Sequence, residues 1–236
     1  RATNSSMEYN IHLLEDAAKY NLMVNFHGAT IPRGWQRTYP NLMSVEAVYG
    51  AEWYNNNGVL THRAAAHNAT LPFTRNVVGP MDYTPGTFSD SQHPHITTYA
   101  HELALPVIFE SALQHMPDRP SVYYGLPEQV KQFLSALPTA WDDTKLLAGY
   151  PGTEVVMARR KGDVWYIAGI NGTDEPRVIG VPLENLGLEK SCKVTWFKDG
   201  SDGKSFVTEE SVSLPENGKV VQVTCLPRGG FVAVVK

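Results

Sequence analysis

The sequence predicts a chain in two parts: the second half of a (β/α)8 barrel, followed by an antiparallel β-sandwich. Helical patterns and short apolar runs alternate up to Pro138, and only short β-rich runs follow it. Strand, polar loop and helix in repetition are typical of βα units around a parallel sheet, but there are too few units here for a whole barrel. We place the division near Pro138–Asp142, which gives an α/β part at 1–138 and a β part at 139–236.

The first part contains two clear amphipathic helices and several short apolar runs. Apolar residues at helical spacing predict helices over 6–21 and 126–137, the second ended by Pro138. The apolar run 22–26 predicts a strand that ends directly at His27. Two further runs predict buried strands, one from Leu71 into the Gly/Pro-rich loop that carries Asp82, and one at Leu105–Phe109 after a helix.

The second part has the turn spacing of an antiparallel sandwich. Its β-rich runs are bounded by Gly, Asp, Asn and Pro, and hairpin-like turn residues occur in RKGDVW and FKDGSDGK. Cys192 and Cys225 lie in strand-like segments and could pair only if those strands are neighbours, so a disulfide stays open. No cluster of histidines, cysteines or carboxylates marks a site here, and we interpret this part as structural.

Composition narrows the class of partner. The chain has 236 residues and a formal net charge of −4, with no basic patch. This balance argues against nucleic acid as a partner. No apolar run approaches the roughly 20 residues that cross a bilayer, so we expect no membrane span.

Chemistry is concentrated in the stretch 26–54, which carries Glu46 and Glu52 among many aromatic residues. Hydrolysis of a glycosidic bond needs a carboxylic acid and a second carboxylate. Burial against aromatic rings can keep such an acid protonated, and Glu52 stands beside Trp53 and Tyr54. Glu46 could supply an oxygen ligand to Ca²⁺, although two carboxylates alone cannot fill its shell of 6–8 oxygens.

Other polar residues have simpler interpretations. Asp82 is expected to organise its loop as a buried acceptor rather than to act as a catalyst. His27 suits a structural and a functional role equally well. Glu110 and His101 are expected to pack or form hydrogen bonds. The remaining histidines form no metal pattern and are taken as ordinary: His12, His62, His67, His93, His95 and His115.

The stretch FHGATIPRGWQRTYPNLMSVEAVYGAEW closely resembles the signature of glycoside hydrolase family 97. It has that family's His-Gly, Arg-Thr-Tyr-Pro-Asn and E-x-x-x-G-x-E elements, and LPFTRNVVGPMDYTPG, HELALPVIFESALQ and WYIAGING look like later blocks. The resemblance implies an N-terminal β-super-sandwich, a central (β/α)8 barrel and a C-terminal β-sandwich, of which this chain supplies the last half-barrel and last domain. It also implies Ca²⁺ and an α-glucoside or α-galactoside substrate.

By this resemblance, Glu52 matches the proton-donating glutamate and Glu46 a calcium ligand, with Glu52 close to the same ion. His27 matches a histidine that lines the sugar pocket. Gly28 matches the glycine of the retaining α-galactosidase branch, where the inverting α-glucosidases have a glutamate that serves as base. The retaining nucleophile, an aspartate, would lie a few residues before Arg1, and the remaining calcium ligands would come from the N-terminal domain.

We therefore expect a calcium-dependent, retaining exo-α-galactosidase of which this chain is the C-terminal portion. Its partners would be an oligosaccharide or α-galactoside substrate and the missing N-terminal part, in a periplasmic or secreted protein by analogy with the family. Two alternatives remain: an inverting α-glucosidase of the same family, and a non-catalytic carbohydrate-binding protein. We expect the isolated chain to be inactive and poorly stable, since half a barrel leaves open strand edges.

Overall fold

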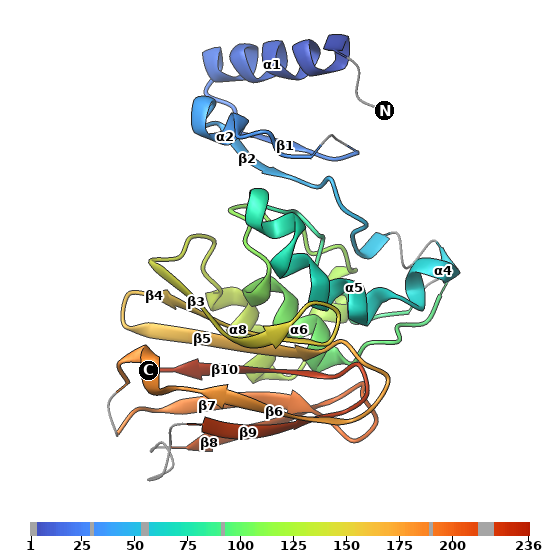
Figure 1. The fold of residues 1–236 in the computed structure, drawn as a ribbon, viewed down its shortest axis with the longest axis vertical. Helices are drawn as coiled ribbons and strands as arrows, with labels where there is room; N and C mark the ends of the chain where they lie inside the picture. The colour runs from blue at the N-terminus through green and yellow to red at the C-terminus, as the bar shows by residue number, and fades with distance from the viewer. Residues whose placement is uncertain (1–3, 29–30, 53–56, 91–92, 189–190, 212–219) are drawn as a thin grey trace.

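A computed structural model of the chain describes residues 4–28, 31–52, 57–90, 93–188, 191–211 and 220–236. It is an antiparallel β-rich structure with helices packed on one face of its main sheet, beneath a small N-terminal layer (Figure 1). The elements of the first part are α1 (Asn4–Lys19), β1 (Val24–Phe26), α2 (Trp35–Thr38), β2 (Leu42–Val45), α4 (Gly58–Thr61), α5 (Ala64–Thr70), η1 (Leu71–Phe73), η2 (Arg75–Val78), α6 (Tyr99–Ile108), α7 (Pro120–Tyr124) and α8 (Glu128–Ala136).

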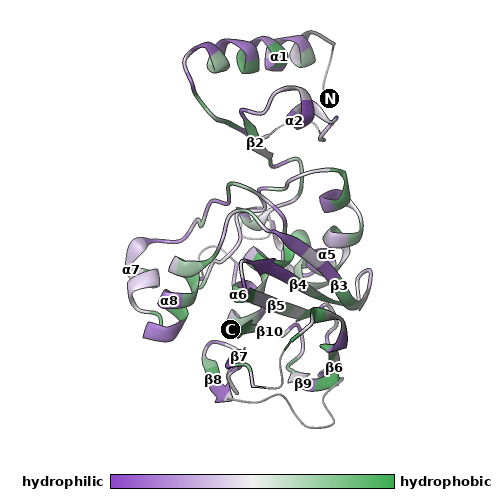
Figure 2. Ribbon diagram, turned by 90° about the vertical axis from the view of Figure 1, so that its left-hand side faces the viewer, coloured by the Kyte–Doolittle hydropathy of each residue, from purple (hydrophilic) through white to green (hydrophobic). Residues whose placement is uncertain are grey.

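The N-terminal layer consists of α1, α2 and the parallel pair β1–β2, and it projects from the rest of the molecule in both ribbon views (Figure 1 and Figure 2). Leu14 of α1 packs there with Leu42 and Val45 of β2, and all three are buried. The helix predicted over 6–21 is confirmed. Its apolar face packs against this small sheet, as the spacing of its apolar residues indicates. The two parallel strands agree with a βα arrangement, and the larger half-barrel stays a prediction.

The second part forms a six-stranded antiparallel sheet in the order β3-β4-β5-β10-β7-β8, with β6 and β9 as a separate antiparallel pair. One core cluster lies between the large sheet and the helices α5, α6 and α8, and another between the sheet and β6–β9. The strands are β3 (Asp143–Tyr150), β4 (Glu154–Lys161), β5 (Val164–Asn171), β6 (Arg177–Pro182), β7 (Val194–Asp199), β8 (Phe206–Ser211), β9 (Val220–Cys225) and β10 (Gly230–Val235), with the short helix η3 (Glu184–Leu186) between β6 and β7.

The two cysteines are buried free thiols on the β6–β9 side of the sheet. Cys225 ends β9 and is fully buried, and Cys192 precedes β7. Burial raises the pKa of each thiol. They act in this fold as small apolar side chains of the core.

Two of the predicted strands are wrong. The run from Leu71 folds as the short 3-10 helices η1 and η2, and in it only Met81 pairs, through an isolated parallel bridge to Val45. The run Leu105–Phe109 belongs to α6, which continues through Pro106 to Ile108. A short apolar run that is buried on every side looks the same in a helix as in a strand, so its periodicity cannot distinguish the two.

Helix α6 is held against the sheet by a close backbone approach and a half-buried acceptor. A Cβ at Gly230 of β10 would lie 2.7 Å from the Cα of His101, so only glycine allows this contact. Asp199 of β7 accepts hydrogen bonds from the Thr98 hydroxyl at 2.5 Å and from the backbone amide of Gly230 at 3.1 Å. Thr98 in turn caps α6 by accepting from the amide of His101. These contacts fix where α6 begins.

Candidate active site

Three parallel segments end side by side at one edge of the N-terminal layer. In β1 and β2, Phe26 pairs with Val45, and Val45 pairs in turn with Met81. Residues that follow parallel strands meet at the carboxyl edge of the sheet, where α/β folds bind their ligands. The residues that follow these three strand ends directly are His27, Glu46 and Asp82.

Asp82 is the centre of this edge. Its side chain is 0% exposed, and its Oδ2 accepts from His27 Nε2 at 2.8 Å, from His115 Nδ1 at 2.5 Å and from Asn25 Nδ2 at 2.6 Å. Its Oδ1 accepts from the backbone amides of His115 and Thr84. The expectation of a buried acceptor that organises the loop describes this geometry, and Asp82 also joins two histidines.

The charge of Asp82 fixes which ring nitrogen of His27 and of His115 carries a proton toward it. Burial raises its pKa, but hydrogen bonds from His27, His115 and Asn25 more than offset that effect, so the pKa is lowered overall. An ionised carboxylate can only accept. Each histidine therefore donates an N–H to Asp82, His27 through Nε2 and His115 through Nδ1.

Glu46 lies on the other side of His27. It is 6% exposed, and its Oε2 accepts from the backbone amide of Gly28 at 2.5 Å. Its Oε1 lies 3.7 Å from Nδ1 of His27. No lysine or arginine in the described ranges forms an ion pair with this buried side chain, so no cation of the chain competes with a ligand for its oxygens.

Arg75 of η2 ties the Glu46 segment to the Asp82 segment. Its guanidinium donates to five backbone carbonyls, those of Val45, Glu46, Ala47, Gly79 and Pro80. The planar fork of arginine suits several acceptors at once. Burial lowers the pKa of Arg75 to about 10, so it stays charged at neutral pH.

Glu52 lies apart from this cluster. It is exposed, and no contact with Glu46 occurs within the part of the chain that the structure describes. Its predicted aromatic neighbours Trp53 and Tyr54 lie outside the described residues. A hollow of about 320 Å³ opens beside the preceding segment, with Tyr49 among the residues of its wall. The other residues that line the hollow include Gly50, Leu60, His67, Thr70 and Tyr83.

His115 is the residue of this site that the sequence did not indicate. It stands 33 positions from Asp82 and belongs to no motif. Only the fold brings it to the same carboxylate as His27, with the two rings 5.5 Å apart and nearly perpendicular. The ligand atoms of His27, Asp82 and His115 lie within 4.8 Å of one another, a donor set that could also hold a metal ion.

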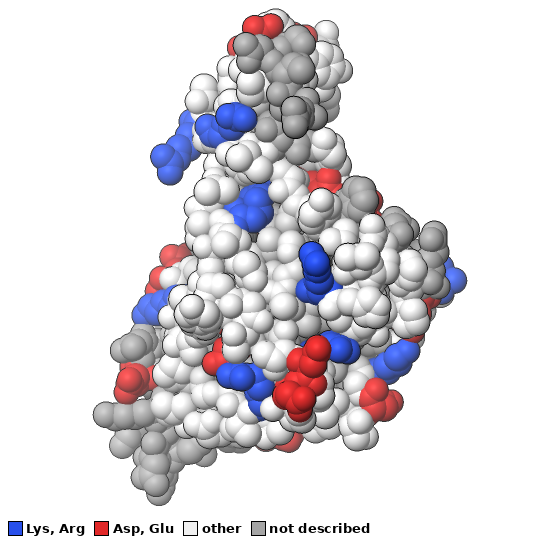
Figure 3. Space-filling model, turned by 45° about the vertical axis from the view of Figure 1, so that its right-hand side comes forward, with Lys and Arg blue, Asp and Glu red and all other residues white. Residues whose placement is uncertain are grey.

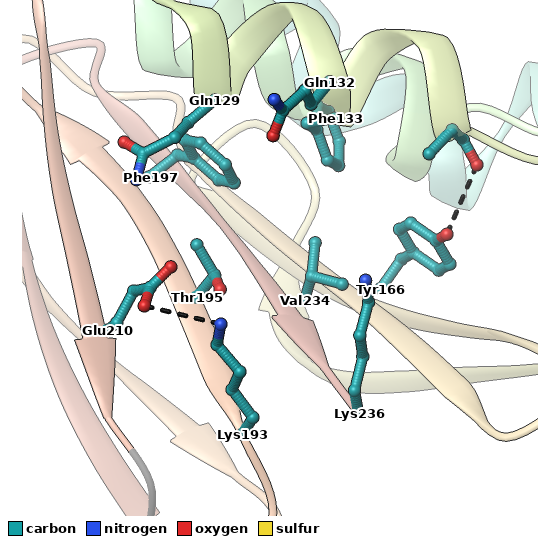
Figure 4. A pocket seen from close by; sticks show the side chains of 11 residues that line it. Gln129, Gln132, Phe133, Tyr166, Lys193, Thr195, Phe197, Glu210, Val234 and Lys236 are labelled. Atoms are coloured by element: carbon teal, nitrogen blue, oxygen red, sulfur yellow. Dashed lines mark hydrogen bonds and ion pairs between the residues drawn. The ribbon is translucent and has the colours of Figure 1, made fainter.

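Another hollow, of about 200 Å³, lies between α8 and the large sheet (Figure 4). Two of the charged groups that line it pair with each other, Lys193 with Glu210 at 3.5 Å. The Tyr166 hydroxyl donates to the carbonyl of Ala136 at 3.3 Å. None of the predicted site residues lines it, and we assign it no role.

Charges of both signs are scattered over the face seen in Figure 3, with acidic and basic side chains side by side near its base. None of the helices in the described ranges is long and apolar enough to cross a membrane.

Comparisons with known proteins agree on a single protein family, glycoside hydrolase family 97. Residues 1–48 match a family described as "Glycoside hydrolase 97", and residues 140–236 match "Glycosyl-hydrolase 97 C-terminal, oligomerisation". A "Probable retaining alpha-galactosidase" of Streptomyces bingchenggensis is 41% identical over 94% of this chain and 33% of its own length. A "Retaining alpha-galactosidase" of Bacteroides thetaiotaomicron is 37% identical over 97% of this chain and 36% of its own length. The chain thus spans about a third of the curated relatives it matches.

Solved structures point the same way. A crystal structure of a β-arabinopyranosidase superposes with a TM-score of 0.87 and 32% identity, over 97% of this chain and 37% of that one. A glycoside hydrolase family 97 enzyme from Pseudoalteromonas sp. strain K8, in complex with panose, superposes with a TM-score of 0.84 and 27% identity. That alignment covers 98% of this chain and 37% of the enzyme.

Proposed function

Because this chain belongs to glycoside hydrolase family 97, we propose that it is the C-terminal part of a calcium-dependent, retaining exo-α-galactosidase. Two curated relatives of 41% and 37% identity carry the name retaining α-galactosidase. Gly28 supports the retaining branch, because the inverting branch carries a glutamate there. A Cβ at Gly28 would meet no atom within 4 Å, but the backbone there has a φ of 63°, a left-handed conformation that by itself favours glycine.

The observation that carries the proposal is the common edge of the three parallel segments. His27, Glu46 and Asp82 each follow directly on a parallel strand position, and His27 contacts both carboxylates. Active sites of (β/α)8 enzymes are built from residues at the carboxyl ends of barrel strands. This arrangement supports residues 1–138 as the second half of such a barrel, with His27 on the sugar side of the site.

Glu52 is the proposed acid/base. It would protonate the glycosidic oxygen as the bond to the anomeric carbon breaks, while an aspartate upstream of this chain forms the glycosyl-enzyme. It would then take a proton from the water that releases galactose. In a retaining enzyme these two carboxyl groups lie about 5–5.5 Å apart. The exposure of Glu52 in this chain is compatible with a site that the upstream half completes.

Glu46 fits a calcium ligand. It offers a buried carboxylate with no lysine or arginine partner among the described residues, and Ca²⁺ prefers such oxygens. Glu52 is the second proposed ligand in this chain. Calcium, when bound, would supply positive charge beside the reacting sugar. The cluster of His27, Asp82 and His115 offers two nitrogens to one oxygen and does not suit a calcium ion.

The stereochemistry of the reaction tests the proposal. Proton NMR of the full-length parent acting on an aryl α-galactoside should show the α-anomer of galactose before mutarotation. Release of the β-anomer first would mean inversion and would contradict the assignment of the branch. Binding of galactose without turnover would instead favour a carbohydrate-binding protein.

The role of Glu52 is tested by leaving-group dependence. Glu52→Gln should lower kcat/KM for methyl α-galactoside by about 10²–10⁴-fold, because a poor leaving group needs the proton. A substrate with an activated phenol should lose much less. Glu184→Gln, an exposed glutamate in η3, is the matched control and should leave both substrates unaffected. Near-normal hydrolysis of the methyl glycoside by E52Q would refute this role.

A further inference from the structure

The segment after α6 holds His115 in a fixed position at the carboxyl edge. Asn76 makes two hydrogen bonds to the backbone of Glu110, at 2.7 and 3.0 Å, and the Met81 amide donates to the Glu110 carbonyl at 2.9 Å. The Gln114 amide donates to the carbonyls of Pro106 and Phe109, at the end of α6, at 3.1 and 3.2 Å. The backbone of Glu110 thus lies beside that of Met81 and forms a fourth segment at this edge. His115 comes five residues later in the same segment.

Asp82 holds two imidazoles by opposite nitrogens. His27 contacts it through Nε2 and His115 through Nδ1, which leaves Nδ1 of His27 and Nε2 of His115 without that partner. Nδ1 of His27 faces Glu46. Nε2 of His115 has no hydrogen-bond partner among the described residues, and the side chain is 55% exposed. A neutral imidazole in this tautomer presents a lone pair at that nitrogen.

We propose that His115 is a second sugar-contacting residue, whose Nε2 accepts a hydrogen bond from a galactose hydroxyl, and that Asp82 is the positioning residue for His27 and His115. This inference rests on the proposed function. Hydroxyl groups are the donors that a terminal galactose offers on every face. A fixed acceptor beside His27 gives an exo-acting site a second point at which to recognise them.

The distances favour this assignment over a metal site. Nε2 of His27 and Nδ1 of His115 lie 2.8 and 2.5 Å from one and the same oxygen of Asp82, which are hydrogen-bond distances. Three ligands held tetrahedrally at about 2.0–2.2 Å from a zinc ion would lie more than about 3 Å from one another. The cluster is therefore arranged to share protons with a carboxylate.

The experiment measures kcat/KM of the full-length parent on an aryl α-galactoside and on its 2-, 3-, 4- and 6-deoxy analogues. His115→Asn is the test variant, because its amide nitrogen stands close to the position of Nδ1 and keeps the contact with Asp82 while Nε2 is lost. His12→Gln, an exposed histidine of α1, is the matched control. Melting temperatures establish that each variant is folded.

The expected result is a loss of about 10–100-fold for H115N on the complete substrate and almost none on one of the deoxy analogues. Asp82→Asn should remove the same discrimination, and combining it with H115N should add little, since both act on one contact. An equal loss of kcat/KM for H115N on every deoxy analogue, or a loss no larger than that of H12Q, would overturn the inference while the proposed function stands. Zinc inhibition at micromolar concentration that H115N abolishes would also overturn it, in favour of a metal site. A parent without α-galactosidase activity would overturn both.

Discussion

Replacement of Arg75 by methionine should destabilise the protein and loosen the candidate site. Its five hydrogen bonds join the segment around Glu46 to the segment before Asp82. Methionine keeps much of the length of the side chain but can donate nothing to these carbonyls. The site therefore loses the connection that holds two of its carboxylates in register.

The magnitude follows from which carbonyls have another donor. The Val45 carbonyl also accepts from the Asp82 amide, and the Gly79 carbonyl from Asn76. The carbonyls of the other three residues depend on Arg75 among the described residues. A half-buried acceptor that loses its donor costs about 1 kcal/mol, so we expect a loss of about 3 kcal/mol for Arg75→Met.

The assay compares thermal unfolding of the full-length R75M with that of Arg160→Met. Arg160 is a half-buried arginine whose described hydrogen bond goes to a single carbonyl, that of Gly162, at 2.7 Å. R75M should melt several degrees below R160M and gain less thermal stability from added calcium, because the carbonyl of Glu46 is no longer held. Arg75→Lys should lie between them, since one ammonium group cannot reach five carbonyls. Equal melting temperatures for R75M and R160M would refute the reasoning.

Three further predictions concern the loop before Glu52, the pH dependence of stability and the buried thiols. Gly50→Ala should lower kcat, because its Cβ would lie 2.7 Å from the carbonyl oxygen of Tyr83 and the backbone before Glu52 would have to shift; unchanged kinetics would contradict this. Burial lowers the pKa of His101 to about 3, so its contribution to stability is full above about pH 6.5 and is lost as the pH falls towards 3. Between pH 7 and 5 that loss is about 2 kcal/mol, and His101→Gln should remove it; an unchanged pH slope of unfolding would count against burial as the cause. Cys225, fully buried, should react with a thiol reagent only when the protein unfolds, and labelling of the native protein would disprove its placement.

Local sequence was enough to predict Glu46, Glu52 and His27 as site residues, while their contacts could be seen only in the fold. Local sequence placed each of the three directly after or near a predicted strand, and the structure places His27 and Glu46 in one cluster. Glu52 stays a prediction, since the residues that directly follow it in the chain lie outside the described residues. Asp82 was expected as a buried acceptor, but the two histidines it would hold could not be named from the sequence.

The sequence by itself determined the elements whose signal is periodic and local. The helices α1 and α8 and the antiparallel strands after Asp142 follow from apolar spacing, turn residues and Pro138, all of which act within a few residues. Only the tertiary structure decided the run at Leu105–Phe109, because the choice between helix and strand depended on what covers it. It alone also brought His115 to Asp82, since contacts between residues far apart in the chain arise from packing and leave no local pattern in the sequence.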